Sequence, residues 1–466
     1  MICGRHGSKE SLKEIYQPYQ NGQGAEVEGR FTRLWDIDIL RPDTSPKYLL
    51  AKLGKTTGLM DEGTEVNALA DSNIPAGFTF VGQFIDHDIT FDTVSQLDSQ
   101  AKPGSIRNGR TPALDLDCLY AGGLEQSPFL YVPDIGQTPG GRMITQIATD
   151  RHTGEQFEEL PRFPVADGIQ RALIGDMRND ENPFVAQFHL AMLKFHNAFM
   201  NQGLSREVAR DHVIHYYHRM ILEDFLPQII NADLLSHVCT EGNCYYKIKS
   251  DTLPNMPVEF SVAAYRYGHS QVRERYSYNS NCVDVDLFEL GAFRNVESQI
   301  DWKYLFELED GNYTTMARQI DTALPRILMS MPKRITGKSG DSLAARNLLR
   351  GRTFRLPSGQ SVAEKMAEDE ALMGGEILPV NEDLREMGFK QTPLWYYCLE
   401  EAKVFGSGSE MGPVGGRIIA EVIVGLLEEY RNRTGKGLDY ITDKSVPQAK
   451  AHQFQVIDLL KFAGVA

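Results

Sequence analysis

The residues NIPAGFTFVGQFIDHDITFD, at positions 73–92, decide the fold. Their aromatic side chains recur at helical spacing, at Phe80, Phe84 and Phe91. His87 falls in the same stripe, so the stretch predicts a helix with a histidine on an otherwise apolar face. A buried polar group costs free energy unless it has a partner or a task. We therefore take this helix as the place of a candidate site.

Helical periodicity continues over much of the chain, and strand signals are few and short. ITQIATDRHTGE predicts a short hairpin around Thr153 and Gly154. The sequence predicts a mainly α protein, with an N-terminal extended arm at 1–65 and a single large helical domain with few short strands at 66–466. The further helices that we expect span residues 182–202, 205–230, 258–276, 342–352 and 415–433.

The composition excludes two classes of partner. The chain has 466 residues and a formal net charge of −15, and it has no basic stripe for a nucleic-acid backbone or an anionic membrane surface. No apolar run reaches the roughly eighteen residues of a membrane-spanning helix, and MICGRHGSKESLKEIYQ shows no signal peptide. We expect no nucleic-acid and no membrane partner. The oligomeric state stays open, as does the compartment, which is cytoplasmic or reached by export without a leader.

Polar residues gather beside His87 in GQFIDHD. On a helix, Gln83, Asp86 and His87 lie at i, i+3 and i+4 and share one face, while Asp88 points to the side. A catalytic histidine would need such neighbours. The alternative is a core histidine whose hydrogen bonds are satisfied.

Three more clusters could take part in the same chemistry. In GDMRNDENP, Arg178 and Glu181 lie at i, i+3 where a helix begins, and they could equally form a surface ion pair. His269 lies mid-helix among aromatic residues in AYRYGHSQVRER, where a core histidine is the alternative. In RNLLRGR, Asn347 and Arg350 lie at i, i+3, and a solvated basic helix face is the alternative.

The segment TPALDLD, residues 111–117, is rich in hard oxygen donors. Thr111, Asp115 and Asp117, with the backbone carbonyls between them, could supply most of the six to eight oxygens that calcium prefers. A turn rich in aspartate is the alternative. The sequence therefore offers a calcium site without requiring one.

Two other sets of potential ligands have simpler interpretations. His212, His215 and His218 recur at steps of three, a spacing that drifts around a helix, and we expect a structural or surface role for them. The six cysteines form no CxxC pair, so a zinc ribbon is not expected. Whether Cys239 and Cys244 form a small disulfide stays open.

Taken together, the five clusters resemble the peroxidase–cyclooxygenase superfamily, the animal-type haem peroxidases, in both order and residue type. The resemblance runs from about Gly29 to the GPVGGRIIAEVIVGLL segment, and NIPAGFTFVGQFIDHDITFD is similar to bacterial members of the superfamily. GQFIDHD and RYGH are its specific motifs, and the Asn347 and Arg350 pair is a weaker one.

For one side of a haem, the resemblance implies a distal site. His87 matches the distal base, Gln83 its neighbour in the pocket, and Arg178 the distal arginine. Asp86 and Glu181 match the two carboxylates that form ester links to haem b. The chemistry agrees, because a histidine can move the proton of bound peroxide and an arginine can stabilise the charge that develops as the bond breaks.

For the other side, the resemblance implies a proximal site and a calcium ion. His269 matches the ligand of the haem iron, Asn347 its hydrogen-bond partner through the amide oxygen, and Arg350 an arginine that pairs with a haem propionate. A bound calcium ion would fix the distal helix, because one ligand adjoins His87 in sequence. The residues that match the calcium ligands are Asp88, Thr111, Ala113 by its carbonyl, Asp115 and Asp117.

The resemblance implies a haem peroxidase that reduces hydrogen peroxide and then oxidises small donors, such as phenols, halides or pseudohalides, through an oxyferryl intermediate. Asn182 stands where the mammalian enzyme with a third haem link has methionine, so no sulfonium bond is expected. The alternatives are a fatty-acid dioxygenase or cyclooxygenase and a non-enzymatic haem- or calcium-binding matrix protein. Dioxygenases of the superfamily have a tyrosine three positions before the proximal histidine, where this chain has Arg266. Tyr265 and Tyr267 flank it but are rotated by about 100 degrees on a helix.

Overall fold

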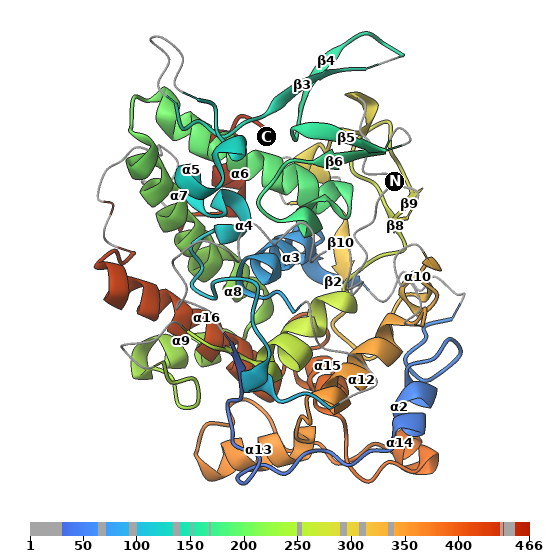
Figure 1. Cartoon of the computed structure of the whole chain (residues 1–466). Helices are drawn as coiled ribbons and strands as arrows, with labels where there is room; N and C mark the ends of the chain where they lie inside the picture. Colours follow the sequence, from blue (N-terminus) through green and yellow to red (C-terminus); the bar gives the residue numbers. More distant parts are fainter. Residues whose placement is uncertain are drawn as a thin grey trace.

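The computed structural model is built mainly of helices around a central one (Figure 1). It describes residues 30–63, 71–92, 100–133, 140–150, 152–166, 169–248, 254–288, 296–306, 314–333, 340–438, 441 and 453–466. The α-helices of these residues are α2 (Lys47–Leu53), α3 (Gly77–Ile89), α4 (Asp117–Tyr120), α5 (Gly123–Gln126), α6 (Pro183–Asn201), α7 (Arg206–Met220), α8 (Leu226–Ile229), α9 (Ala232–Glu241), α10 (Arg326–Met329), α12 (Leu343–Thr353), α13 (Gly359–Glu368), α14 (Glu382–Met387), α15 (Leu394–Phe405), α16 (Pro413–Thr434) and α17 (Val456–Phe462).

Shorter elements connect these helices. The 3₁₀ helices are η2 (Pro103–Ser105), η3 (Pro128–Leu130), η4 (Met177–Asp180), η7 (Ala264–His269), η8 (Val296–Ser298) and η9 (Trp302–Tyr304), and the π-helices are η5 (Ile221–Phe225) and η6 (Glu259–Ala263). The strands form two-stranded pairs: β1 (Phe31–Thr32) with β7 (Met256–Pro257), β2 (Asp71–Pro75) with β10 (Met316–Arg318), β3 (Gln146–Thr149) with β4 (Gln156–Glu159), β5 (Arg162–Ala166) with β6 (Ile169–Ala172), and β8 (Arg275–Tyr276) with β9 (Val285–Asp286). All pairs are antiparallel except β1 with β7. The mainly α architecture is therefore confirmed.

The central helix α3 is buried along nearly its whole length. It packs against α6 on one side and against η4, η5 and η7 on others. A Cβ atom added to Gly82 would lie 3.6 Å from the hydroxyl of Tyr267, within van der Waals contact, so α3 and η7 pack against each other. Because α3 carries GQFIDHD and η7 carries RYGH, the fold brings the two specific motifs into contact.

The helix ends follow local rules. The Asn182 side chain accepts hydrogen bonds from the backbone N–H groups of Phe184 and Val185, and Pro183 occupies the first turn, so α6 begins as predicted. The turn η5 between α7 and α8 is wide, and this accommodates Pro227, which lacks an N–H group and would crowd the carbonyl four residues earlier. The predicted helices at 182–202, 205–230, 342–352 and 415–433 are confirmed.

The predicted helix at 258–276 is wrong in its second half. The segment is helical only to His269, first as the π-helix η6 and then as the 3₁₀ helix η7, and residues 275–276 form β8 instead. Ala263 leaves helical geometry at the junction (φ −124°, ψ −82°), and Gly268 has low helix propensity. His269 therefore lies at the end of a helical segment and not in the middle of one.

Two other predictions concern the edges of the molecule. The hairpin around Thr153 and Gly154 is present, and it projects as β3 and β4 at the top of Figure 1. Residues 30–63 of the expected arm contain α2 and contribute Phe31, Trp35 and Leu53 to the core. The division into an arm at 1–65 and a domain at 66–466 stays a prediction. Among the helices that the structure describes, none is long and apolar enough to cross a membrane.

Candidate active site and acidic cluster

The C-terminal half of α3 places His87 next to an arginine from a distant segment. Arg178 lies in η4, and its Nη2 atom donates a hydrogen bond of 2.9 Å to the carbonyl oxygen of His87. The guanidinium carbon of Arg178 also lies 4.4 Å from the centroid of the Phe91 ring. His87 and Arg178 are both buried, and burial, reinforced by the charge of Arg178, lowers the pKa of His87. The structure thus brings these two predicted residues together.

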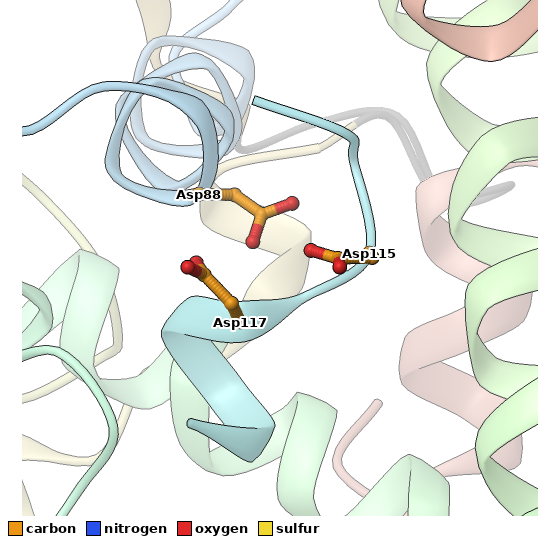
Figure 2. A group of neighbouring side chains, drawn as sticks. All are labelled: Asp88, Asp115 and Asp117. Atoms are coloured by element: carbon orange, nitrogen blue, oxygen red, sulfur yellow. The ribbon is translucent and has the colours of Figure 1, made fainter. Parts of the chain in front are cut away.

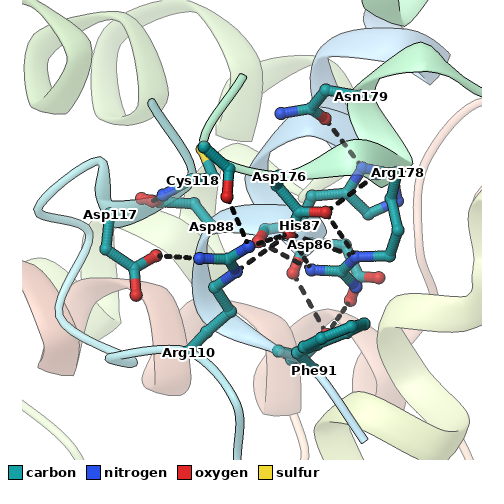
Figure 3. Close-up of polar contacts among 12 residues, drawn as sticks. Asp86, His87, Asp88, Phe91, Arg110, Asp117, Cys118, Asp176, Arg178 and Asn179 are labelled. Carbon is teal, nitrogen blue, oxygen red and sulfur yellow. Dashed lines mark hydrogen bonds and ion pairs between the residues drawn. The ribbon is translucent and has the colours of Figure 1, made fainter. Parts of the chain in front are cut away.

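A carboxylate that the sequence analysis missed holds Arg178. Asp176 is fully buried and accepts hydrogen bonds from Arg178 Nη2 at 2.7 Å and from Arg110 Nη2 at 2.6 Å (Figure 3). Burial alone would raise the pKa of Asp176, but the charges of Arg110 and Arg178 hold that pKa well below its usual value. Asp176 also caps η4 by accepting from the backbone N–H of Arg178. An aspartate at a helix start was the signal in the sequence.

A second missed residue contacts His87 directly. The Asn179 Oδ1 atom lies 2.8 Å from Nδ1 of His87, and Figure 3 draws both residues. The Nδ2 atom of Asn179 lies 3.0 Å from Nδ1 of His189. Little in the sequence points to this contact, because Asn179 lies within η4 and resembles an ordinary polar residue beside Arg178.

The other residues that we expected on the side of His87 also meet. Gln83 Nε2 donates a hydrogen bond of 3.4 Å to Glu181 Oε2, and Asn182 Nδ2 donates one of 3.1 Å to Gln83 Oε1. Asp86, on the same face of α3, accepts from the hydroxyl of Thr90 at 2.8 Å. Asn182 therefore both caps α6 and holds Gln83. It has this structural role at the position where the enzyme with a third haem link has methionine.

On the opposite side, α12 supplies a partner to His269. Asn347 Nδ2 lies 2.8 Å from Nδ1 of His269, so the two residues meet as expected. The amide end that faces the ring is the nitrogen, whereas we expected the oxygen. Oδ1 against an Nδ1–H group is the arrangement that would leave Nε2 of His269 for a metal, so the contact agrees with the expectation and the orientation of the amide does not.

An ion pair joins the helix that contacts His269 to the segment that follows His87. Arg350, one turn after Asn347 on α12, contacts Asp92 with an Nη1 to Oδ2 distance of 3.0 Å. Asp92 follows α3 by three residues. The helix that holds the partner of His269 is therefore tied to the segment that follows His87.

Several of the residues that would contact a haem have partly exposed side chains, although their neighbours in the chain are buried. In α3, Gln83 and Asp86 are partly exposed although Phe84 and Ile85 between them are fully buried. His269 and Arg350 are partly exposed as well. An imidazole backed by an amide, two carboxylates and an arginine form a donor set that fits a haem.

Three aspartates form a compact acidic cluster (Figure 2). One ligand atom each from Asp88, Asp115 and Asp117 lies within 4.8 Å of the others. Burial, and then the charges of the other two, raise the pKa of Asp88 well above its usual value, and burial raises that of Asp117 to about 7. The Oδ1 atoms of Asp115 and Asp117 are buried without a hydrogen bond. The three carboxylates repel one another, and two of their oxygens lack a hydrogen bond although Arg110 Nη1 lies 3.6 Å from Asp117 Oδ1, a combination that fits a site for a hard cation.

The loop before α4 adopts an unusual backbone to form this cluster. Leu114 and Leu116 have positive φ angles of 50° and 59°, a region that side chains other than those of Gly, Asn and Asp rarely adopt. The loop also turns at its start, where the N–H of Ala113 donates to the carbonyl of Thr111. It is held from outside by His218, which bonds the carbonyl oxygen of Leu114 at 2.8 Å.

The histidines of α7 are buried and have structural contacts, as expected. His212 Nδ1 bonds the carbonyl oxygen of Val208 at 2.8 Å, within the same helix, and His218 holds the acidic loop. In the part of the chain that the structure describes, the only clustered metal-ligand side chains found among His, Cys, Asp and Glu are the three aspartates. Cys239 and Cys244 are free thiols.

These features are the ones that the sequence resemblance led us to expect of a haem peroxidase, and the comparison with family models agrees. The model described as animal haem peroxidase matches residues 95–367, which is more than half of the chain. The chain therefore belongs to the animal haem peroxidase family. No curated protein matches it.

Solved structures show the same fold at low sequence identity. Peroxidase A from Dictyostelium discoideum is 15% identical with a TM-score of 0.60, and the match covers 95% of this chain and 94% of that one. A fatty acid alpha-dioxygenase from Oryza sativa is 16% identical with a TM-score of 0.58, covering 95% and 82%. A fatty acid alpha-dioxygenase from Arabidopsis thaliana is 14% identical with a TM-score of 0.58, covering 94% and 77%. The fold is thus common to a peroxidase and to dioxygenases.

Proposed function

We propose that this protein is a haem peroxidase that reduces hydrogen peroxide and oxidises small reducing substrates such as phenols, halides or pseudohalides. The observation that carries the proposal is the buried contact between His87 and Arg178. We also infer membership of the bacterial branch, which rests on the resemblance of residues 73–92. Neither a nucleic acid nor a membrane is a partner in this proposal.

Five residues would hold the haem b. His269 would bind the iron through Nε2, with Asn347 at its other nitrogen, and Arg350 would pair with a propionate. Asp86 and Glu181 would form ester links to the porphyrin edge. When bound, the haem supplies the site at which peroxide is cleaved and the store of oxidising equivalents for the donor.

The distal residues would move one proton and stabilise charge. His87 would accept the proton of peroxide at Nε2 and deliver it to the departing oxygen, for which a ring that is neutral at rest is required; its lowered pKa supports this. Arg178 is locked between Asp176 and the His87 carbonyl and so presents a preorganised positive charge to that oxygen. Gln83, held by Asn182, would orient the peroxide.

A calcium ion would complete the distal side. Its ligands in the proposal are Asp88, Thr111, the carbonyl of Ala113, Asp115 and Asp117. The cation would offset the repulsion among the three carboxylates. By binding Asp88, it would also hold the end of α3 that carries His87.

The second candidate function is a fatty-acid dioxygenase. The shared fold favours neither enzyme, so the choice rests on side chains. Arg266 stands where a dioxygenase would need its tyrosine. Tyr265 and Tyr267 are both buried, with their rings nearly perpendicular and 5.8 Å apart, and Tyr265 stacks on Phe260. A packed tyrosine has little freedom to meet an acyl chain, which supports the peroxidase.

The proposal is tested with haem-loaded protein. We expect a haem absorption spectrum that changes within seconds of adding hydrogen peroxide and returns when iodide or a phenolic dye is added. His87→Leu should slow the peroxide step by about a thousand-fold, within the range of general acid–base catalysis, without loss of haem. His152→Leu, in the exposed β3–β4 turn, is the control. A spectrum that peroxide leaves unchanged would reject the peroxidase and favour a non-enzymatic haem protein.

A further inference from the structure

A line of three buried side chains runs away from the proposed reaction centre. It begins at His87 on α3, passes through Asn179 on η4 and ends at His189 on α6. Asn179 and His189 are fully buried. Neither Asn179 nor His189 takes part in the proposed binding of haem or in the proposed proton transfer.

The amide of Asn179 connects the protonation of the two rings. A neutral imidazole carries one N–H group, and an amide has one accepting and one donating end. As Oδ1 faces His87 and Nδ2 faces His189, Nδ1 of His87 must donate and Nδ1 of His189 must accept. The proton of His87 is then on Nδ1, and its Nε2 atom keeps a lone pair. The opposite amide orientation would put the proton on Nε2 and leave no acceptor there.

The line ends at His189. In this arrangement the proton of His189 is on Nε2, and that atom is buried without a hydrogen-bond partner among the described residues. The ring of Phe84 packs against His189 with centroids 5.9 Å apart. Burial lowers the pKa of His189 to about 3, so the ring stays neutral. Because no acceptor follows, the line holds a proton in place and does not conduct one.

We propose that Asn179, backed by His189, is a positioning residue that fixes the ring orientation and the tautomer of His87, so that Nε2 is the proton acceptor. This inference rests on the proposed function, since the acceptor matters only if His87 handles the proton of peroxide. Arg178 holds the backbone carbonyl of His87 but not its ring, so the two partners divide the task. Other enzymes orient a basic histidine through its second nitrogen in the same way.

The first test measures the tautomer directly. In the full chain loaded with gallium protoporphyrin and labelled with ¹⁵N-histidine, nuclear magnetic resonance reads which nitrogen of His87 carries the proton. We expect Nδ1–H in the parent and a mixture of tautomers in Asn179→Leu. A parent with the proton on Nε2 would overturn the proposal. This measurement needs no peroxide reaction, so it fails separately from the proposed function.

The second test is kinetic. Asn179→Leu should lower the second-order rate constant for hydrogen peroxide by about 100-fold, while haem content and the rate of donor oxidation stay unchanged. His189→Leu should lower it by about ten-fold, as expected from the loss of one buried hydrogen bond. His189→Gln should restore the parent rate, because its amide oxygen can accept from Asn179.

Asn197→Leu provides the matched control. Asn197 lies on α6, as His189 does. Its buried amide makes two hydrogen bonds, one with the N–H and one with the carbonyl of Met143. Its loss should lower stability without changing the peroxide rate. Equal rate losses in Asn197→Leu and Asn179→Leu, or His189→Gln no faster than His189→Leu, would reduce Asn179 to a packing residue. If Asn179→Leu does not fold, the pair of His189 variants decides.

Discussion

At the scale of single residues, the candidate site depends on contacts that no local pattern contains. Asp176 binds two arginines, Asn179 binds two histidines, and each is only one or two positions from Arg178, which the sequence did single out. Each has one partner far away in the chain, Arg110 for Asp176 and His87 for Asn179. Sequence spacing can place side chains on one helix face, but it cannot say which distant side chain that face meets.

The proposal that His269 binds the haem iron is tested by His269→Ala. We expect this variant to lose haem or to hold it weakly, because His269 alone combines the RYGH motif with an amide partner at Nδ1. The ratio of Soret absorbance to protein absorbance after gel filtration measures the loss. His152→Ala should retain haem, and a normal spectrum in His269→Ala would make the ligand assignment wrong.

The ester links are tested by denaturing mass spectrometry. We predict that peroxide treatment of haem-loaded protein attaches the haem covalently, because Asp86 and Glu181 are partly exposed on facing segments. Asp86→Asn combined with Glu181→Gln should release all haem into acidic acetone. Asp180→Asn, next to Glu181 but paired with Arg162, should behave as the parent does. Haem that is fully extractable from the treated parent would contradict the prediction.

At the scale of elements, the long periodic helices were predictable and the irregular ones were not. The patterns of α3, α6, α12 and α16 extend over three turns or more, so an apolar face is evident from the sequence. The change from η6 to η7 occurs within a stretch whose residues still suit an α-helix, and packing against α15 and α16 accompanies it. Two leucines with positive φ could not be expected either, because nothing in their side chains favours that region.

The loop at residues 111–117 gives a prediction about metal content. We expect one calcium ion per chain, and a strong chelator should lower the midpoint of thermal unfolding by several degrees, because unshielded carboxylates would then repel one another. Asp115→Asn should reduce calcium affinity at least ten-fold, while Asp383→Asn, on the exposed side of α14, should not. If the purified protein contained no calcium and the chelator did not change its midpoint of thermal unfolding, the calcium site would be wrong.

Helix α6 gives a prediction about pH. Burial lowers the pKa of His189 to about 3 and that of His196 to about 4, from an ordinary value of 6.5. The unfolded chain binds these protons more readily, so stability is fully present above pH 6.5 and falls as the pH drops towards 4. Each histidine should cost about 1.4 kcal/mol per pH unit in that range.

His196→Gln isolates one of these contributions. Its amide can still bond the hydroxyl of Tyr120, which His196 contacts at 3.1 Å. Between pH 7.5 and 5.5, the free energy of unfolding should therefore fall less in the variant than in the parent. Equal losses over this interval would show that His196 titrates normally in the folded protein.

At the scale of the whole molecule, the fold brings the GQFIDHD motif of α3 and the RYGH motif of η7 together at the candidate haem site. The segment after α3 and the helix α12 are tied by the pair of Asp92 and Arg350, and η7 packs between α3 and the C-terminal helices α15 and α16. Membership of the animal haem peroxidase family and the fold shared with Peroxidase A are consistent with this arrangement. The same fold occurs in fatty acid alpha-dioxygenases, so architecture alone does not define the reaction.

The central claim is tested most directly by giving the haem-loaded enzyme both kinds of substrate. We predict that it oxidises iodide or a phenolic dye when hydrogen peroxide is added, and that it consumes little oxygen with unsaturated fatty acids. Arg178→Leu should abolish most of the first activity without changing the second. Robust oxygen uptake with a fatty acid that disappears in Tyr265→Phe or Tyr267→Phe, together with no oxidation of the peroxidase donors, would contradict the account.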